Sequence, residues 1–365
     1  MKDRYRRGII PDFDIWETGV ISATEINRCF DQVATTVLSE SYIKQAKEFT
    51  IKRSAIAGYE ELKAMGEEIS RERIMEKISE MNHLDIDFNY RPIHIREVLK
   101  DVFRMICESN YKDMISFGFK SMDDDLYGIE KEELVVVAGS TSVGKTSLAI
   151  KILIENSVKR DYAGAYFAIE SGRKIIMARI FSQMTKIPLK NIMVNQLDLD
   201  DKEKILQTME TLGEKRIIID DLESLNVNKL KILAETYKIE NDIQYIIIDH
   251  LNDMASDEKF SSPYQERSTQ VSEIKKLARH LKIPIILLCQ LSRGEYLKGK
   301  EPPSIFNIRD SGRIAEIADK VIILYKENKF GDEYIAGVQK NRNGPKRDFR
   351  LLFMKEYAGF KELVE

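Results

Sequence analysis

The chain has few cysteines for its 365 residues. Cys29, Cys107 and Cys289 are scattered, so they provide neither a C-x-x-C pair for metal or redox chemistry nor the dense set that staples a small secreted domain. This usage predicts a reducing compartment, the cytoplasm.

The sequence also lacks a long apolar run. Segments such as 283–289 are far shorter than the ~18 residues that would cross a bilayer. The basic start MKDRYRR is followed by the acidic stretch GIIPDFDIWETG, not by the apolar core of a signal peptide. We therefore expect no membrane partner and no secretion.

The chain also has no large excess of positive or negative charge. The formal net charge is −3, which predicts no broad basic surface for nucleic acid. Residues 290–350 nevertheless carry a net charge of +4, so the positive potential is concentrated in the C-terminal part. With 43% apolar residues the chain should fold, and its length predicts two domains or one large domain with an appendage.

Three regions differ in their pattern. Residues 1–90 have apolar residues at helical spacing and predict a small, abbreviated all-helical region with a helical hairpin. Residues 91–112 predict a linker with an amphipathic helix, whose apolar stripe includes Ile95 and Leu99. Residues 113–365 alternate short apolar runs with helical patterns.

These alternating runs predict an α/β domain with a mainly parallel sheet covered on both faces. The end of the chain differs, because two strand-like runs flank an Asn-Gly turn and predict a terminal β-hairpin. The predicted strands are ELVVVAG, AGAYFAIE, RIIIDD, QYIIIDH, IPIILLCQ and KVIILY, followed by YIAGVQK and DFRLLFM around NRNGPKR.

The sharpest motif is GSTSVGKT, which lies between a predicted strand and a predicted helix. Its glycines let backbone N–H groups surround phosphate oxygens, Lys145 would reach the β- and γ-phosphates, and Thr146 would hold Mg²⁺. The alternative is a plain glycine-rich turn. The predicted nucleotide-binding residues are Gly139, Ser140, Thr141, Ser142, Val143, Gly144, Lys145, Thr146 and Ser147.

Polar residues at other strand ends would complete such a site. Asp249 is the candidate second metal ligand, with Asp220 and Asp221 as rivals, and Glu170 could act on the attacking water. Gln290 could place an amide near the γ-phosphate. Strand-end acids and amides also cap helices and bond locally, so each retains that simpler interpretation.

Residues 116–353 contain, in this order, SFGFKSMDDDLYGIEKEELVVVAGSTSVGKTSLAIKILIE, AIES, YIIIDHLN, PIILLCQLSR, NIRDSGRIAEIADKVIILY and VQKNRNGPKRDFRLLF. The order and spacing of these segments give the region a resemblance to the helicase domain of DnaB-like replicative helicases. It implies a RecA-like fold, a hexameric ring with ATP and Mg²⁺ between neighbouring subunits, and 5′ to 3′ translocation on single-stranded DNA with duplex unwinding.

The resemblance also assigns roles. Lys145 and Thr146 bind nucleotide and Mg²⁺, Glu170 is the catalytic glutamate, Asp249 holds the metal through water, and Gln290 senses the γ-phosphate. In NIRDSG, the DNA-gripping residues are Arg309, Asp310 and Gly312; in KNRNGP, Lys340 and Arg342 are the basic pair that reaches the neighbour's ATP. An ordinary loop and a solvated basic hairpin are the simpler interpretations of these two segments.

The N-terminal third departs from the family, because it is too short for both a full helical head and a helical hairpin. This difference puts the usual collar and the docking of a primase in doubt and suggests a phage, plasmid or otherwise divergent replication helicase. A primase and a helicase loader are partners that the resemblance implies. The alternative to a helicase is a RecA-like DNA-dependent ATPase, recombinase-like or regulatory, that assembles without unwinding.

Overall fold

The protein is described by a computed structural model over residues 95, 99, 114–256, 260, 262–292, 302–308, 313–326 and 331–363. The chain divides into two compact units, Met1–Pro92 and Ile93–Glu365, and all described residues belong to the second. The predicted helical region 1–90 lies outside the described residues, as does most of the predicted linker 91–112. Its Ile95 and Leu99 are helical and 65% and 57% exposed.

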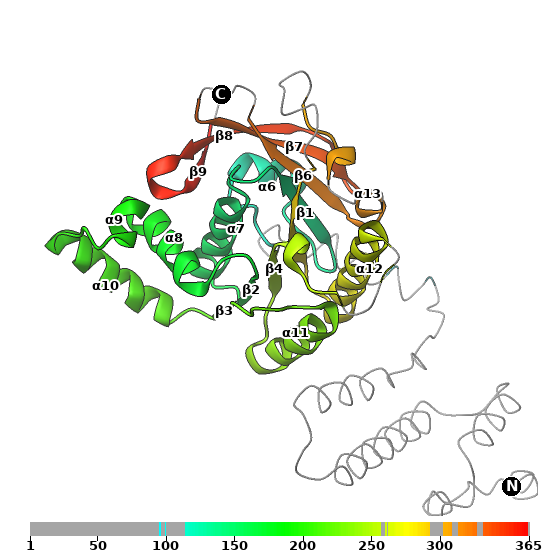
Figure 1. Cartoon of the computed structure of the whole chain (residues 1–365), viewed down its shortest axis with the longest axis horizontal. Coiled ribbons are helices and arrows are strands. Elements are labelled where there is room, and N and C mark those ends of the chain that lie inside the picture. Colours follow the sequence, from blue (N-terminus) through cyan, green and yellow to red (C-terminus); the bar gives the residue numbers. More distant parts are fainter. Residues whose placement is uncertain are drawn as a thin grey trace, which may run out of the picture. The chain divides into compact units, whose positions relative to one another are not determined.

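Among the described residues, nine strands form one sheet in the order β3-β2-β4-β5-β1-β6-β7-β8-β9 (Figure 1). The first six in this order are parallel, and the last four are joined by antiparallel pairings. The strands are β1 Leu134–Gly139, β2 Gly164–Ala168, β3 Ile217–Asp220, β4 Tyr245–Asp249, β5 Ile285–Gln290, β6 Lys320–Tyr325, β7 Glu333–Asn341, β8 Asp348–Met354 and β9 Gly359–Glu362.

Alternating residues of the central strands are buried on opposite faces. Val135 and Val137 of β1 pack on the side of α7 and α8, whereas Val136 and Ala138 pack on the side of α11 and α12 (Figure 1). Both faces are apolar, as parallel sheets require. The helices are α6 Lys120–Leu126, α7 Lys145–Leu153, α8 Arg173–Thr185, α9 Leu189–Met193, α10 Leu199–Gly213, α11 Val227–Asn241, α12 Pro263–Leu281 and α13 Ile314–Ile317.

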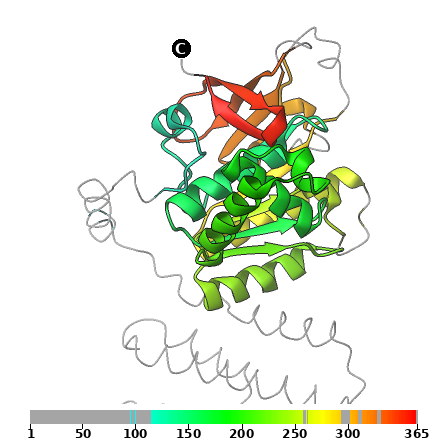
Figure 2. The same ribbon diagram turned by 90° about the vertical axis from the view of Figure 1, so that its left-hand side faces the viewer.

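The predicted terminal hairpin is confirmed. β7 and β8 pair antiparallel, with Gly337 opposite Asp348, and the Asn-Gly segment lies in the connection between them. The structure adds a strand that the sequence did not predict, because β9 pairs with β8 at the end of the sheet (Figure 2). This strand places Phe360 in the core, with its ring against Gly144 at the start of α7. The α/β fold with a mainly parallel sheet is thus as expected, with a longer antiparallel end.

The helix after the glycine-rich loop, α7, is an α-helix only as far as Leu153. It changes after Leu153 into a π-helix, η3, over Ile154–Lys159. The side chain of Asn156 donates to the carbonyl of Ile152, which its own backbone N–H would take in an α-helix, and also to the carbonyl of Ser116. This competition by a buried side chain favours the wider turn.

No helix in the described ranges is long and apolar enough to span a membrane.

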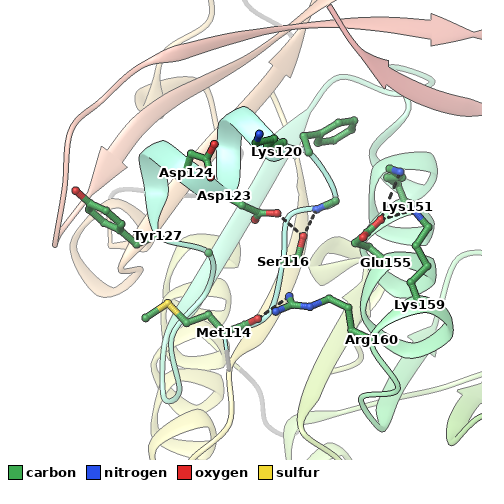
Figure 3. Close-up of a pocket in the computed structure, with 13 residues that line it drawn as sticks. Met114, Ser116, Lys120, Asp123, Asp124, Tyr127, Lys151, Glu155, Lys159 and Arg160 are labelled. Carbon is green, nitrogen blue, oxygen red and sulfur yellow. Dashed lines mark hydrogen bonds and ion pairs between the residues drawn. The ribbon is translucent and has the colours of Figure 1, made fainter. Parts of the chain in front are cut away.

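A pocket of about 620 Å³ lies beside α6 and the end of α7, with both basic and acidic side chains on its walls (Figure 3). Asp123 lines this pocket and accepts hydrogen bonds from Ser116 Oγ and from the backbone N–H of Phe117 at 2.7 Å. Burial raises the pKa of the Asp123 carboxyl to about 6, against the lowering effect of these two hydrogen bonds.

This raised pKa predicts how the stability of the domain depends on pH. Between 3.8 and about 6 the folded chain binds more protons at Asp123 than the unfolded chain, so stability falls as the pH rises through this window. Asp123→Asn keeps both hydrogen bonds without the charge. We expect it to reduce the loss of unfolding free energy between pH 4 and 7 by about 1–3 kcal/mol.

Urea denaturation at several pH values, followed by far-ultraviolet circular dichroism, measures this effect. The exposed neighbour Asp124 is the matched control, and Asp124→Asn should leave the pH dependence unchanged. An identical pH profile for Asp123→Asn and the unmodified chain would contradict the assignment.

Candidate active site

The predicted glycine-rich motif forms a tight loop between β1 and α7. Gly144 caps α7 with φ +101°, and Ser142 is also left-handed with φ 63°. Two of its glycines are sterically required: a Cβ on Gly139 would lie 2.5 Å from Val143 Cγ1, and one on Gly144 would lie 2.8 Å from the ring of Phe360. The sequence therefore folds into a loop whose backbone curls around the N-terminus of a nine-residue helix.

Lys145 is the first residue of α7 and is only 8% exposed. Its Nζ donates to the carbonyls of Gly139 and Ser140, each at 3.0 Å. Burial lowers the pKa of Lys145, and the carboxylates of Asp249 and Glu170 oppose this effect. The ammonium group of Lys145 thus stabilises the loop through two of its carbonyls and is attracted by both predicted acids.

Asp249 ends β4 and is 2% exposed. Its Oδ2 accepts a hydrogen bond of 2.7 Å from the hydroxyl of Tyr166, which lies on the neighbouring strand β2. Burial and the adjacent carboxylate raise the pKa of Tyr166 well above its usual value, so this phenol remains a donor. Tyr166 orients Asp249, a role that its place in an apolar strand did not indicate.

Glu170 lies two residues beyond β2, at the same sheet edge. Its backbone N–H donates to the carbonyl of Asp249 at 3.3 Å, and its side chain is 52% exposed. His250 is 6% exposed, with Nε2 at 3.7 Å from Glu170 Oε2 and Nδ1 at 3.0 Å from Asp253 Oδ2. The most exposed of these groups is thus the one predicted to act on water.

Gln290 ends β5 directly opposite Gly139 of β1 in the parallel register. Its Nε2 donates to Thr141 Oγ1 at 2.6 Å, and its backbone N–H donates to Asn252 Oδ1 at 3.0 Å. The structure therefore places Gln290 against the glycine-rich loop. Asn252 fixes the end of β5 and was not identified from the sequence.

The two rival acids are engaged elsewhere. Asp220 accepts from the hydroxyl of Tyr237 at 2.7 Å, and Asp221 Oδ1 lies 2.8 Å from Nε of Arg173 at the start of α8. Asp221 also accepts from the backbone N–H of Arg173 at 3.0 Å. Both acids thus have structural partners, although neither caps the helix that follows its strand, because Asn226 caps α11.

Lys340 and Arg342 lie at the opposite end of the strands, near the start of β6. The backbone N–H of Arg342 donates to the carbonyl of Asp319, just before β6, whereas Gly139 of the loop pairs with Leu324 near the end of β6. Five residues of chain, ~17 Å, separate these levels. The structure thus gathers Lys145, Asp249, Glu170 and Gln290 and does not bring the basic pair to them.

Residues 114–362 match the family model of the DnaB-like helicase C terminal domain, which is more than half of the chain. The chain belongs to the DnaB-like helicase family. The replicative DNA helicase DnaC of Bacillus subtilis is 32% identical over 258 residues, a stretch that covers 68% of this chain and 56% of that protein. The chain therefore spans little more than half the length of this relative.

Two solved structures support the same fold. One is described as an ATPase domain and aligns with a TM-score of 0.70 at 25% identity, covering 75% of this chain and all of that one. A DnaB-like replicative helicase, described together with its interactions with primase, aligns with a TM-score of 0.74 at 24% identity, covering 100% of this chain and 90% of that one. The latter likeness concerns the fold alone.

The DnaB-like segment NIRDSG falls largely outside the described residues, and with it Arg309, Asp310 and Gly312. The described residues beside it are attached close to Gln290. Leu291 forms a β-bridge with Ile308, and the backbone N–H of Ser292 donates to the carbonyl of Asn307 at 2.7 Å. Ile308, the last described residue before Arg309, is thus bridged to the residue that follows Gln290.

Proposed function

We propose that this chain is an ATP-driven DNA helicase that forms a ring and couples hydrolysis to 5′ to 3′ translocation on single-stranded DNA. The observation that carries the proposal is that the predicted site residues lie at two opposite ends of the strands. Lys145, Glu170, Asp249 and Gln290 gather at one end, while Arg342 lies at the other. This placement supports a role in which Arg342 completes the site of a second copy of the chain.

The chemistry of the gathered groups suits ATP hydrolysis. Loop N–H groups and the N-terminus of α7 would hold the phosphates, and Lys145 would exchange its carbonyl contacts for phosphate oxygens. Glu170, half exposed and beside Asp249, would orient and deprotonate water. Gln290 would report on the γ-phosphate through its contact with Thr141.

The donor set also fits Mg²⁺. Thr146 and Asp249 offer a hydroxyl and a carboxylate, which are the oxygen ligands this ion prefers, and Tyr166 fixes the carboxylate in place. Mg²⁺ would neutralise negative charge on the β- and γ-phosphates. Thr146 on α7 and Asp249 on β4 would hold it directly or through water.

DNA contact is assigned to Arg309, Asp310 and Gly312. A glycine lets backbone N–H groups approach phosphates, and a guanidinium binds them with paired hydrogen bonds. The attachment of this segment next to Gln290 supports a mechanical link between the nucleotide state and the DNA grip.

Assembly of the ring would bury exposed apolar surface on both of the subunits that meet at each interface. Ile95 and Leu99 of the predicted linker helix are exposed, and the region of α9 and α10 carries exposed Met193, Leu199 and Leu206. A hexamer, a primase partner and a helicase loader are family properties that we extend to this chain, which would act in a bacterial or phage-infected cytoplasm.

Strand displacement on forked DNA tests the function. We expect unwinding with ATP when the fork carries a 5′ tail and little with a 3′ tail alone, together with ATPase activity that single-stranded DNA stimulates. Sizing of the same protein should reveal a ring-sized assembly. DNA-stimulated ATPase without strand displacement would instead support an assembling RecA-like ATPase.

A further inference from the structure

Asp319 is a buried carboxylate at the sheet edge opposite the glycine-rich loop, between α13 and β6, and it is 5% exposed. Its Oδ2 accepts from Lys275 Nζ of α12 and from the backbone N–H of Leu134 at 2.8 Å. Its Oδ1 accepts from Arg342 Nη1 at 3.1 Å. Donors from α12, β1 and the β7–β8 connection therefore converge on one side chain.

The two cations on Asp319 differ in their surroundings. Lys275 is 12% exposed, and its Nζ also donates to the carbonyl of Glu132 at 2.8 Å. Arg342 is 51% exposed, and its backbone N–H donates to the carbonyl of Asp319 at 3.0 Å. The backbone of Arg342 is thus fixed at the start of the β7–β8 connection, while half of its side chain faces solvent.

We propose that Asp319 is a resting site for the guanidinium of Arg342, and that Lys275 is the permanent counter-ion that allows Arg342 to leave it. The inference rests on the proposed function of Arg342 toward the neighbour's ATP. Asp319 and Lys275 are positioning residues in this account, because neither lies at the nucleotide.

The electrostatics of a buried carboxylate explain why two cations are needed. A buried charge that loses its sole partner is strongly destabilised. With Lys275 and the Leu134 N–H in place, Asp319 retains a cation and a hydrogen bond when Arg342 swings out. Because Asp319 also pairs with Lys275, it attracts Arg342 less strongly, so the guanidinium is held at Asp319 without being trapped there.

Lys275→Met in the full chain tests the proposal. Arg342 then becomes the cation on which Asp319 depends, and its departure becomes costly. We expect kcat of the DNA-stimulated ATPase to fall about tenfold, with KM for ATP within about twofold of the unmodified value. Lys275→Arg should keep wild-type kcat. Adding Asp319→Asn to Lys275→Met should restore kcat to within about twofold, because no buried charge then holds the guanidinium.

The next residue on α12 provides the matched control. Lys276 is 69% exposed and pairs with Glu273, so Lys276→Met should leave kcat unchanged. Should Lys275→Met fail to fold, Lys275→Gln makes the same charge change and retains a donor for the Glu132 carbonyl, with the same expected result. Normal kcat in the folded variant, or a loss that Asp319→Asn does not reverse, would overturn the resting site.

Arg342→Ala, measured in parallel, separates the two proposals. Normal turnover in Arg342→Ala would remove the role of Arg342 in hydrolysis and the resting site with it. Impaired turnover in Arg342→Ala beside normal turnover in Lys275→Met or Lys275→Gln would overturn the resting site alone.

Discussion

Lys145→Ala should abolish ATP hydrolysis and weaken ATP binding, whereas Glu170→Gln should remove turnover and spare binding. The lysine would contact phosphate oxygens in both the bound state and the transition state, while the glutamate would act only on the attacking water. We expect each variant to lose at least ~100-fold in kcat. Steady-state ATPase and the affinity for a fluorescent ATP analogue separate the two effects.

Two side chains nearby serve as matched controls. Asp220 also ends a strand of this sheet but accepts from Tyr237, and Lys151 is a second lysine of α7, 3.7 Å from Glu155. Asp220→Asn and Lys151→Ala should leave kcat within about twofold of the unmodified value. Turnover above about a tenth of the unmodified rate in Glu170→Gln would contradict its role at the water.

The half of the site proposed to bind nucleotide could be predicted from the sequence because its signals are local. A glycine-rich loop must lie between a strand and a helix to bind phosphate, and GSTSVGKT occurs between two such patterns. Parallel strands end at a common edge, so Asp249, Glu170 and Gln290 were expected to lie near Lys145, and the structure places them there.

Other features depend on contacts between distant residues. Tyr166 occupies a strand position that any apolar residue could fill, and only the register of β2 with β4 places its hydroxyl on Asp249. Asp319 immediately precedes a strand, where an acid usually bonds a local N–H group. Its contacts with Lys275 and Arg342 depend on packing of α12 and β7 around β6, which no local pattern specifies.

For the basic hairpin, the sequence predicted the turn but not where the hairpin places Arg342. The Asn-Gly turn predicted the hairpin, and the pairing of β7 with β8 confirms it. Which end of the strands receives Arg342 depends on the antiparallel pairing of β7 with β6. A parallel strand there would end level with Gly139, with β6 between them. The direction of that strand is the reason why the proposed role of Arg342 requires a second subunit.

Arg342→Ala should bind ATP normally but lose ~10³-fold or more in turnover, the range known for guanidinium groups that neutralise charge on a transferred phosphoryl group. The connection between β7 and β8 supplies a matched control. Arg347 lies in the same connection, pairs with Asp125 at 2.8 Å and is 67% exposed. Arg347→Ala should leave turnover within about twofold of the unmodified value.

Mixing of inactive variants decides whether Arg342 acts between subunits. An Arg342→Ala subunit retains an intact Lys145, and a Lys145→Ala subunit retains an intact Arg342. In rings formed from equal amounts, about one interface in four joins an intact loop to an intact arginine, so some ATPase should return although neither variant is active alone. A ring mixed from either variant and the Arg342→Ala, Lys145→Ala double mutant has no such interface and should stay inactive.

Differently sized affinity tags on the two variants establish that mixed rings form before activity is measured. Because the sheet places Arg342 ~17 Å along the strands from Gly139, an arginine that acted within its own chain would require the hairpin to leave β6. Mixed rings without returning activity would therefore indicate either such a rearrangement or a turnover cycle that needs several intact interfaces at once. Rings with one inactive subunit among unmodified ones separate these outcomes, because a requirement for several intact interfaces predicts a more than proportional loss of activity.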